Sequence, residues 1–277
     1  MKISLHAFDT SNLQKRCERY SNLLQMSLSN IHQSPANLGT VADDARTYAG
    51  YLSVQNPNSI ELYRALRIAA YSLTEVCRLA TVPEGSYEIF VGEHEPVMLP
   101  SGVTSYSSGI SWLQGFYLAI ACRETHLNDT LAQIPVAILK QSSTRSDEYL
   151  YLQIEALQSF WKGQADTPQR VIEAMKATDP EQVKVGTVDA ALNLAVPEID
   201  LLFRLLENDA TAFNEALVKA LECHKKHWGK KSLKNDPHGF LALGPLGLAA
   251  IAYERGISIE VESDYIPKYI IQGDFLK

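Results

Sequence analysis

The chain has 277 residues, of which 46% are hydrophobic and 21% are charged, so it can bury a large core as one domain or two closely joined halves. Its 25 lysines and arginines and 32 acidic residues give a net charge of −7, which argues against nucleic acid as a partner because phosphate binding requires clustered cations. An acidic surface suits a basic protein partner, although −7 is also an ordinary charge for a soluble protein.

Three helical patterns with short connections occupy the N-terminal part of the chain. Apolar residues recur at steps of three and four over residues 13–31, and a second helix is predicted over residues 37–54. A third follows the turn at residues 56–59 and runs to about Leu79. Consecutive helices with short connections favour antiparallel packing.

A β-hairpin is predicted over residues 86–99. Tyr87, Ile89 and Val91 alternate with other side chains, and a second short run follows at residues 96–99. Glu93 and Glu95 fall at the turn between the two runs. We treat residues 1–277 as a single helical domain, in which a sub-boundary would fall near residues 83–103.

Helical patterns then resume and continue to the basic segment at residues 224–234. The first of them, with Trp112, leaves little polar face and is expected to be buried, and a polar turn is predicted at residues 123–129. Pro197 marks a kink or a new helix start. The predicted helices cover residues 104–121, 130–139, 147–161, 167–177 and 187–194, the region after Pro197, and the stretch from a cap at Asn208-Asp209 to the basic segment.

Residues 236–271 carry the clearest sequence pattern for secondary structure in the chain. Asp236 can cap a helix with Pro237 in its first turn, and residues 240–253 carry no charge, which indicates a buried helix. This apolar run is too short to cross a bilayer, which takes about 20 residues. After Gly256, residues 257–262 alternate between apolar and polar, as in a strand with one buried face. That strand could pair with the hairpin at residues 86–99.

Together these patterns predict a mainly α protein, a multi-helix array of antiparallel helix pairs with a small β-hairpin and one short C-terminal strand. A helical array is favoured over a doubly wound sheet because strands and helices do not alternate along the chain. No strict repeat at a fixed period is found, which argues against a regular solenoid.

The cysteines and the N-terminus indicate a cytoplasmic protein. The cysteines are far apart in apolar helical contexts, which is typical of buried free thiols in a reducing compartment. Residues 1–10 contain no apolar run long enough for a signal peptide. The four cysteines are Cys17, Cys77, Cys122 and Cys223.

Three stretches resemble the immunity protein 49 family, the antitoxin halves of bacterial polymorphic toxin systems. They are residues 236–271, residues 108–139 with an early tryptophan, and the aromatic helix at residues 147–161. The resemblance rests on their order and spacing, and the N-terminal hundred residues share only a helical, amphipathic character. It implies an immunity protein that forms a stable complex with a cognate toxin domain acting in the cytosol.

An enzyme finds little support in the sequence. His224 and His227 are three apart on a helix, with His238 eleven residues further on, and could bind a metal, but the lysines around them oppose a cation. No glycine-rich phosphate loop, H-E-x-x-H or paired C-x-x-C is present. We therefore expect no catalysis and no cofactor, with a helical adaptor or a metal-dependent enzyme using these histidines as the alternatives.

Six residues are candidates for toxin contact. Trp228 is expected to be partly exposed beside the lysines, and tryptophan is enriched in binding hot spots. The acidic side chains are expected to face solvent, where they could enter a cationic substrate cleft of the toxin, although a solvated strand face is the plainer interpretation. The candidates are Glu93, Glu95, Trp228, Glu260, Glu262 and Asp264.

Overall fold

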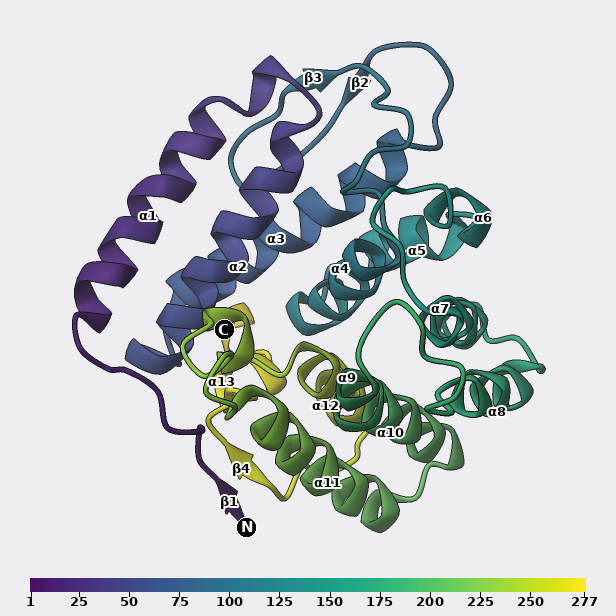
Figure 1. Cartoon of the computed structure of the whole chain (residues 1–277). Coiled ribbons are helices and arrows are strands. Elements are labelled where there is room, and N and C mark those ends of the chain that lie inside the picture. Colours follow the sequence, from purple (N-terminus) through teal and green to yellow (C-terminus); the bar gives the residue numbers. More distant parts are fainter.

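The computed structural model describes all 277 residues as a mainly α-helical protein with four very short strands (Figure 1). The helices are α1 (Leu13–Ser29), α2 (Asn37–Gln55), α3 (Ile60–Leu79), α4 (Gly109–Cys122), α5 (Thr125–Gln133), α6 (Val136–Leu139), α7 (Glu148–Trp161), α8 (Thr167–Ala177), α9 (Val188–Ala190), α10 (Val196–Glu207), α11 (Ala210–Trp228), α12 (Leu243–Glu254) and α13 (Lys268–Ile271). The strands are β1 (Lys2–Ile3), β2 (Tyr87–Glu88), β3 (Val97–Met98) and β4 (Glu262–Ser263). The predicted fold class is confirmed.

The N-terminal layer consists of α1, α2 and α3, which lie side by side (Figure 1). Ser59 caps α3 as the turn predicts, because its hydroxyl accepts the N–H of Leu62 at 3.2 Å. Gly50 on α2 allows the 3₁₀ turn at Pro237–Phe240 to approach closely, since a Cβ there would lie 2.3 Å from the carbonyl oxygen of Pro237. This contact joins the N-terminal layer to the C-terminal segment.

Two helices, α4 and α12, form the centre of the core. Both are largely buried, as their uniform apolarity predicts. Trp112 stacks on Phe116 with ring centroids 4.8 Å apart, and its indole N–H donates to the carbonyl oxygen of Leu131. The helix expected over residues 240–253 begins only at Leu243, because the capped stretch after Asp236 is a short 3₁₀ turn followed by extended backbone.

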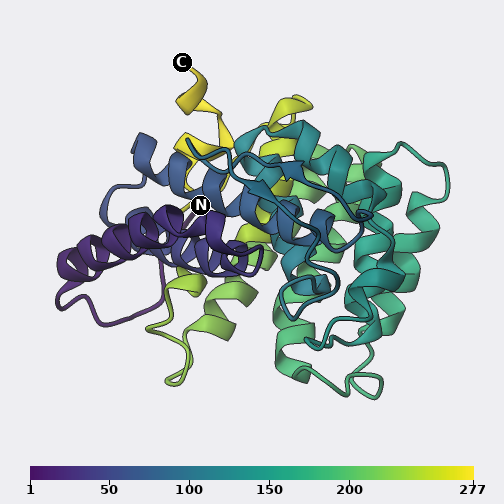
Figure 2. The same cartoon turned by 90° about the horizontal axis from the view of Figure 1, so that it is seen from above.

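The remaining helices pair as α7 with α8 and α10 with α11. Figure 2 shows the segments of α7 and α8 on the side of the molecule opposite α1, with C-terminal segments in between. Helix α9 continues into α10 through a π-helical turn, Ala191–Ala195, directly before Pro197. Pro197 lies in the first turn of α10, where its missing N–H is tolerated, so the predicted helix start at this proline is confirmed.

The polar turn expected at residues 123–129 is wrong in extent. Arg123 alone takes a left-handed conformation, with φ of 62°, and α5 begins two residues later. Leu127 and Asn128 face the core, while His126 and Asp129 face outward. The polar residues on the outer face of this short helix were therefore taken for a loop when only the sequence was considered. The helix expected from residue 104 likewise starts later, after a cap at Ser108.

The hairpin is confirmed, whereas the predicted pairing of the late strand is not. Tyr87 pairs with Met98 and Glu88 with Val97 in an antiparallel register. Strand β4 instead pairs in parallel with β1 at the N-terminus, with Lys2 opposite Glu262. It is also shorter than the strand predicted from residue 257.

Residues 257–261 show the predicted alternation of burial without a neighbouring strand. Ile257 and Val261 are buried, whereas Ser258 and Glu260 are exposed. The side chain of Asn214 on α11 replaces the missing strand, since its amide donates to the carbonyl oxygen of Ser258 and accepts the N–H of Glu260, both at 2.8 Å. The local pattern was therefore right and the partner was wrong.

The buried apolar side chains form one contiguous cluster from Ile3 to Ile271. It draws on both the N-terminal layer and the C-terminal helices, which meet around α4 and α12. A sub-boundary near residues 83–103 stays a prediction. None of the helices combines the length and the apolarity needed to span a bilayer.

Candidate functional site

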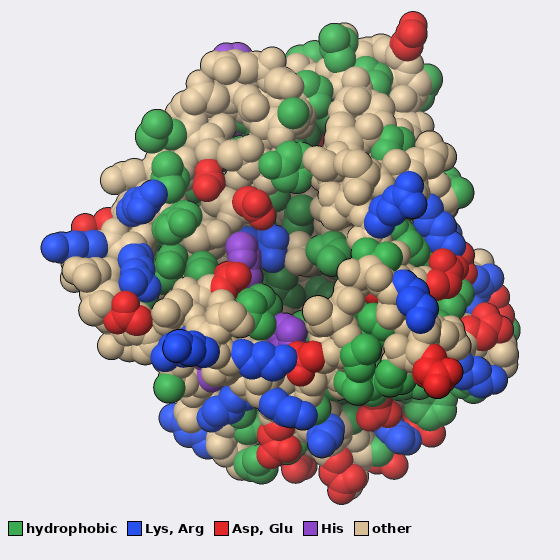
Figure 3. All heavy atoms as spheres, in the orientation of Figure 1, with side chains coloured by type: hydrophobic (Ala, Val, Ile, Leu, Met, Phe, Trp, Pro, Cys, Tyr) green, Lys and Arg blue, Asp and Glu red, His purple; other side chains and the backbone are tan.

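A cleft of about 350 Å³ opens between the N-terminal layer and the C-terminal helices. Figure 3 shows a hollow in the middle of this face, with histidine and hydrophobic side chains around it. The walls come from α2, α4, α7, α9, the π-helical turn, the start of α10, the end of α11, the 3₁₀ turn at Pro237–Phe240 and the start of α12. We call this feature the central cleft. Most of its lining is apolar, and a few polar side chains lie among the apolar ones.

The Glu198 carboxylate forms one polar end of the central cleft. The amide N–H₂ of Gln153 donates to Glu198 at 3.2 Å and to the hydroxyl of Tyr117 at 3.0 Å. The carboxylate lies against the first turn of α12, where a Cβ on Gly244 would lie 2.3 Å from its carboxyl carbon. The Glu198 carboxylate can therefore occupy this position only because Gly244 has no side chain.

Burial raises the pKa of Glu198 to about 7, although the hydrogen bonds from Gln153 and Tyr117 act in the opposite direction. No basic side chain offsets this effect, because no lysine or arginine contributes to the pKa and none forms an ion pair with the carboxylate. The carbonyl oxygen of the Gln153 side-chain amide is also buried, and it has no hydrogen-bond partner. This end of the cleft thus holds a carboxyl group without a cationic partner and a carbonyl oxygen without a donor.

Arg46 and His238 lie on the α2 side of the central cleft. Burial lowers the pKa of Arg46, and its nearest acidic partner is Asp43, at 3.4 Å. The Nε of Arg46 has no acceptor. His238 is held by Asp236, which accepts both its backbone N–H and its ring Nδ1–H at 3.0 Å. Asp236 is therefore a cap, as predicted, and also orients the histidine.

The three histidines of the metal hypothesis each have a protein partner of their own. His224 donates from Nε2 to the carbonyl oxygen of Gly239 at 2.9 Å, and burial lowers its pKa to about 3. His227 binds Asp189 through Nδ1 at 2.5 Å, and the same carboxylate pairs with Lys230. The structure assembles no group of three histidine, cysteine or acidic side chains that could hold a metal. The hypothesis of a metal-dependent enzyme with these ligands thus loses its ligand set.

Trp228 is half-buried and lines the central cleft. It covers Gly239, where a Cβ would lie 2.4 Å from the indole, and it meets His227 edge-on with ring centroids 5.3 Å apart. The sequence predicted partial exposure for Trp228, and the structure agrees. Part of the ring remains available at the cleft.

The five acidic candidates form two separate groups. Glu260, Glu262 and Asp264 are exposed on the segment around β4, beside Lys2, which lies opposite Glu262 in the parallel pair. Glu93 and Glu95 are exposed on the hairpin, at the opposite end of the molecule (Figure 1). The structure therefore does not unite the five side chains into one acidic face, and their contact with a toxin stays a prediction.

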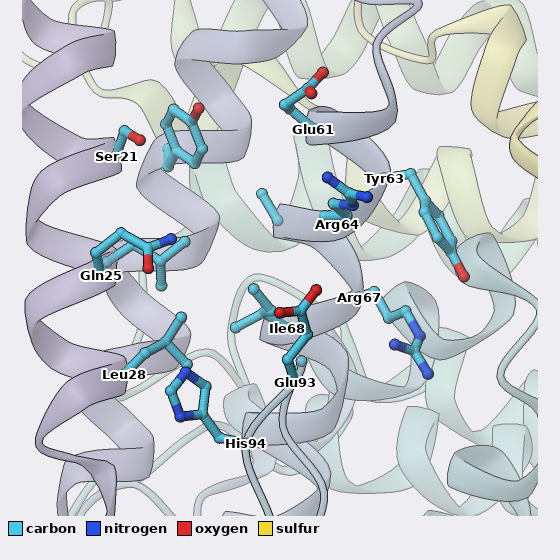
Figure 4. A pocket seen from close by; sticks show the side chains of 14 residues that line it. Ser21, Gln25, Leu28, Glu61, Tyr63, Arg64, Arg67, Ile68, Glu93 and His94 are labelled. Carbon is cyan, nitrogen blue, oxygen red and sulfur yellow. The ribbon is translucent and has the colours of Figure 1, made fainter.

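The hairpin closes a second cavity, of about 390 Å³, against α1 and α3. In Figure 4, His94 projects toward Leu28 on α1, and Glu93 lies over Ile68 on α3. Arg67, also in its lining, is already paired with Glu124 and lies over the ring of Tyr71. Its lining mixes acidic and basic side chains, so this cavity has no single charge preference.

The polar residues of the central cleft were not predicted from the sequence. Glu198 lies four residues after Leu194 and three before Leu201, on a stripe that is otherwise apolar. Gln153 stands four residues after Tyr149 and four before Leu157 on the corresponding stripe of α7. A polar residue on a buried helical stripe was the available signal for both. Arg46 carries no such signal, because its surroundings come from distant parts of the chain.

The fold and the cleft define a mainly α-helical protein with one continuous core and a cleft that has a buried carboxyl group at one end. The chain matches the family model described as Immunity protein 49 over residues 56–270, and it belongs to this family. The suspected resemblance is thereby confirmed. The match includes Gln153, Glu198 and Trp228, whereas Arg46 lies outside it.

Membership of this family implies an immunity protein, which has a toxin protein as its partner and suggests a role other than catalysis. A search of curated proteins gives no match, and neither does a search of solved structures.

Proposed function

We propose that this protein binds one cognate bacterial toxin domain and neutralises it by forming a stable protein–protein complex, without catalysis of its own. The match to the immunity protein 49 family over residues 56–270 carries this proposal. The toxin acts in the cytosol and the complex forms there. A nuclease, a deaminase or a nucleotide-directed enzyme fits such a target better than a cell-wall hydrolase does.

The rigidity of the fold supports binding by a preformed surface. One apolar cluster links the N-terminal layer to the C-terminal helices, and the helices around the central cleft are held by buried side chains. Preformed interfaces change little on binding, so the cleft and its rim are available in the free protein.

The exposed acidic groups support electrostatic steering of a cationic toxin. The segment around β4, with Glu260, Glu262 and Asp264, and the hairpin, with Glu93 and Glu95, are two alternative docking regions because they lie far apart. Trp228 belongs to a third region, the rim of the central cleft.

Co-expression with a candidate toxin domain, taken first from any toxin gene that neighbours this one, tests the proposal. Cells that make the toxin should survive when this chain is present, and the two proteins should copurify with a fixed stoichiometry. A toxin variant without activity serves to measure affinity by calorimetry. Neither rescue nor copurification would overturn the proposed function, and a helical adaptor would become the better interpretation.

A further inference from the structure

We propose that the central cleft receives an arginine side chain from a protruding segment of the toxin, and that the Glu198 carboxylate is its acceptor. The inference rests on the proposed function, because it takes the toxin as the occupant. Glu198 lines the cleft within the fold, whereas the exposed acidic groups lie on the outer surface. Binding of an arginine at Glu198 is therefore distinct from steering by the surface groups.

The first argument is that Glu198 lacks a cation and that the neighbouring carbonyl oxygen of Gln153 lacks a donor. Gln153 is only 1% exposed, and its two N–H groups serve Tyr117 and Glu198, which leaves its carbonyl oxygen without a donor. A buried acceptor without a donor is unfavourable, and a carboxylate without a cation is more so. A guanidinium group supplies several N–H donors in one plane and the missing positive charge, so it satisfies this end of the cleft.

The second argument is the shape and lining of the cleft. Its volume of about 350 Å³ is small for a helix or a strand, and it suits one long side chain with its adjacent backbone. Tyr149 and Trp228 contribute aromatic surface, on which a guanidinium group stacks and against which its aliphatic stem packs. Lysine, a compact and strongly hydrated cation, would use these walls less well.

The third argument is that Arg46 would orient the inserted segment within the cleft. It lines the same cleft on the α2 side, and its Nε has no acceptor. A positive charge there repels an incoming guanidinium toward Glu198. A main-chain carbonyl of the inserted segment can accept from Arg46, so the two polar sides orient the segment.

A double-mutant cycle with an inactive form of the toxin domain tests this assignment. Glu198→Gln retains the shape and removes the charge, and Glu222→Gln removes an exposed glutamate on α11 as the matched control. Calorimetry should show at least a tenfold loss of affinity for Glu198→Gln and no change for Glu222→Gln. One Arg→Ala variant of the toxin should lose affinity against the wild-type chain and little more against Glu198→Gln.

Equal affinity of wild-type and Glu198→Gln chains for the toxin overturns the inference and leaves the proposed function intact. The absence of any wild-type complex overturns both. If Glu198→Gln abolishes binding of agmatine while toxin affinity is unchanged, the cleft binds a small free cation, and the toxin assignment is wrong.

A second pair of variants avoids any dependence on the buried carboxylate. Ile110 lines the cleft and is 43% exposed, and Ile172 on α8 lies outside it with a similar exposure of 40%. Ile110→Lys places a positive charge at the cleft and should weaken the complex at least tenfold, whereas Ile172→Lys should not. Equal affinity of the two lysine variants would also overturn the inference.

Discussion

The ring of Phe275 stacks on the ring of Tyr63, with centroids 4.0 Å apart and an interplanar angle of 13°. This contact holds the last turn of the chain against α3, while Arg123 donates to the carbonyl oxygens of Ile270 and Ile271 just before it. The last turn of the described chain is therefore packed against the N-terminal layer.

We expect Phe275→Ala to lower the free energy of unfolding by about 1–3 kcal/mol, through lost aromatic stacking and lost apolar burial. Urea denaturation followed by circular dichroism measures this. Leu276→Ala is the control, because Leu276 is 65% exposed and should tolerate the change. Equal stabilities for the two variants would show that the stacking contributes nothing.

Acid should destabilise the protein through His224. Its folded pKa of about 3 lies below the ordinary value of 6.5, so the unfolded chain takes up a proton between these pH values and the folded protein does not. The stability from neutral His224 is full above pH 6.5 and is lost as the pH falls toward 3, at up to about 1.4 kcal/mol per pH unit.

Denaturation of the wild type and His224→Gln at several pH values checks this expectation. The variant loses ring contacts with Tyr265 and should be less stable at neutral pH. The difference between the two proteins should nevertheless shrink as the pH falls below 6.5. A constant difference would mean that His224 does not titrate in this way.

Asn214→Ala should free the segment that precedes β4. The variant loses the donor to Ser258 and the acceptor for the Glu260 N–H, at a cost of about 1–3 kcal/mol. Hydrogen exchange of the Glu260 amide should accelerate. Asn214→Asp keeps an acceptor for the Glu260 amide, so this amide should exchange more slowly in the aspartate variant than in the alanine variant. Faster exchange in the aspartate variant would contradict a role of the Asn214 side chain in holding this segment.

Gly244→Ala should displace Glu198. The added Cβ would overlap the carboxylate, and overpacking of this kind costs about 1–3 kcal/mol. Combining it with Glu198→Ala removes the overlap and should recover most of the loss, which thermal unfolding of the two single variants and the double variant measures. Additive losses would show that the two residues do not interact.

Charge reversal separates the two acidic docking regions. If the segment around β4 steers the toxin, the double variant with Glu260→Lys and Glu262→Lys should lower the association rate and its salt dependence. The matched double variant with Glu93→Lys and Glu95→Lys tests the hairpin. Stopped-flow kinetics at several salt concentrations measures both, and unchanged rates for a pair would remove that region from the interface.

Local patterns along the chain predicted most of the helices, since the buried stripes of α1, α3 and α11 and the caps at Ser59 and Asp209 are encoded by neighbouring residues. The same holds for the hairpin. Contacts between distant segments were not predictable in this way. The partner of β4 is a two-residue strand at the N-terminus, too short to carry an alternation of its own.

In the candidate site, too, local patterns could be predicted from the sequence, and contacts between distant segments could not. Exposure of Trp228 could be judged from its basic neighbours, whereas the meeting of Gln153, Glu198 and Gly244 depends on three helices packing together. The acidic residues of the hairpin and of β4 were each placed correctly on the surface. Their separation in space follows from the pairing of β4 with β1, which periodicity does not reveal.

The pairing of β1 with β4 also affects how the protein is made. Lys2 is synthesised 260 residues before its strand partner Glu262. Strand β1 must therefore wait unpaired until β4 has been made. A polypeptide that stops before β4 lacks this closure, so early termination of translation leaves β1 without its partner.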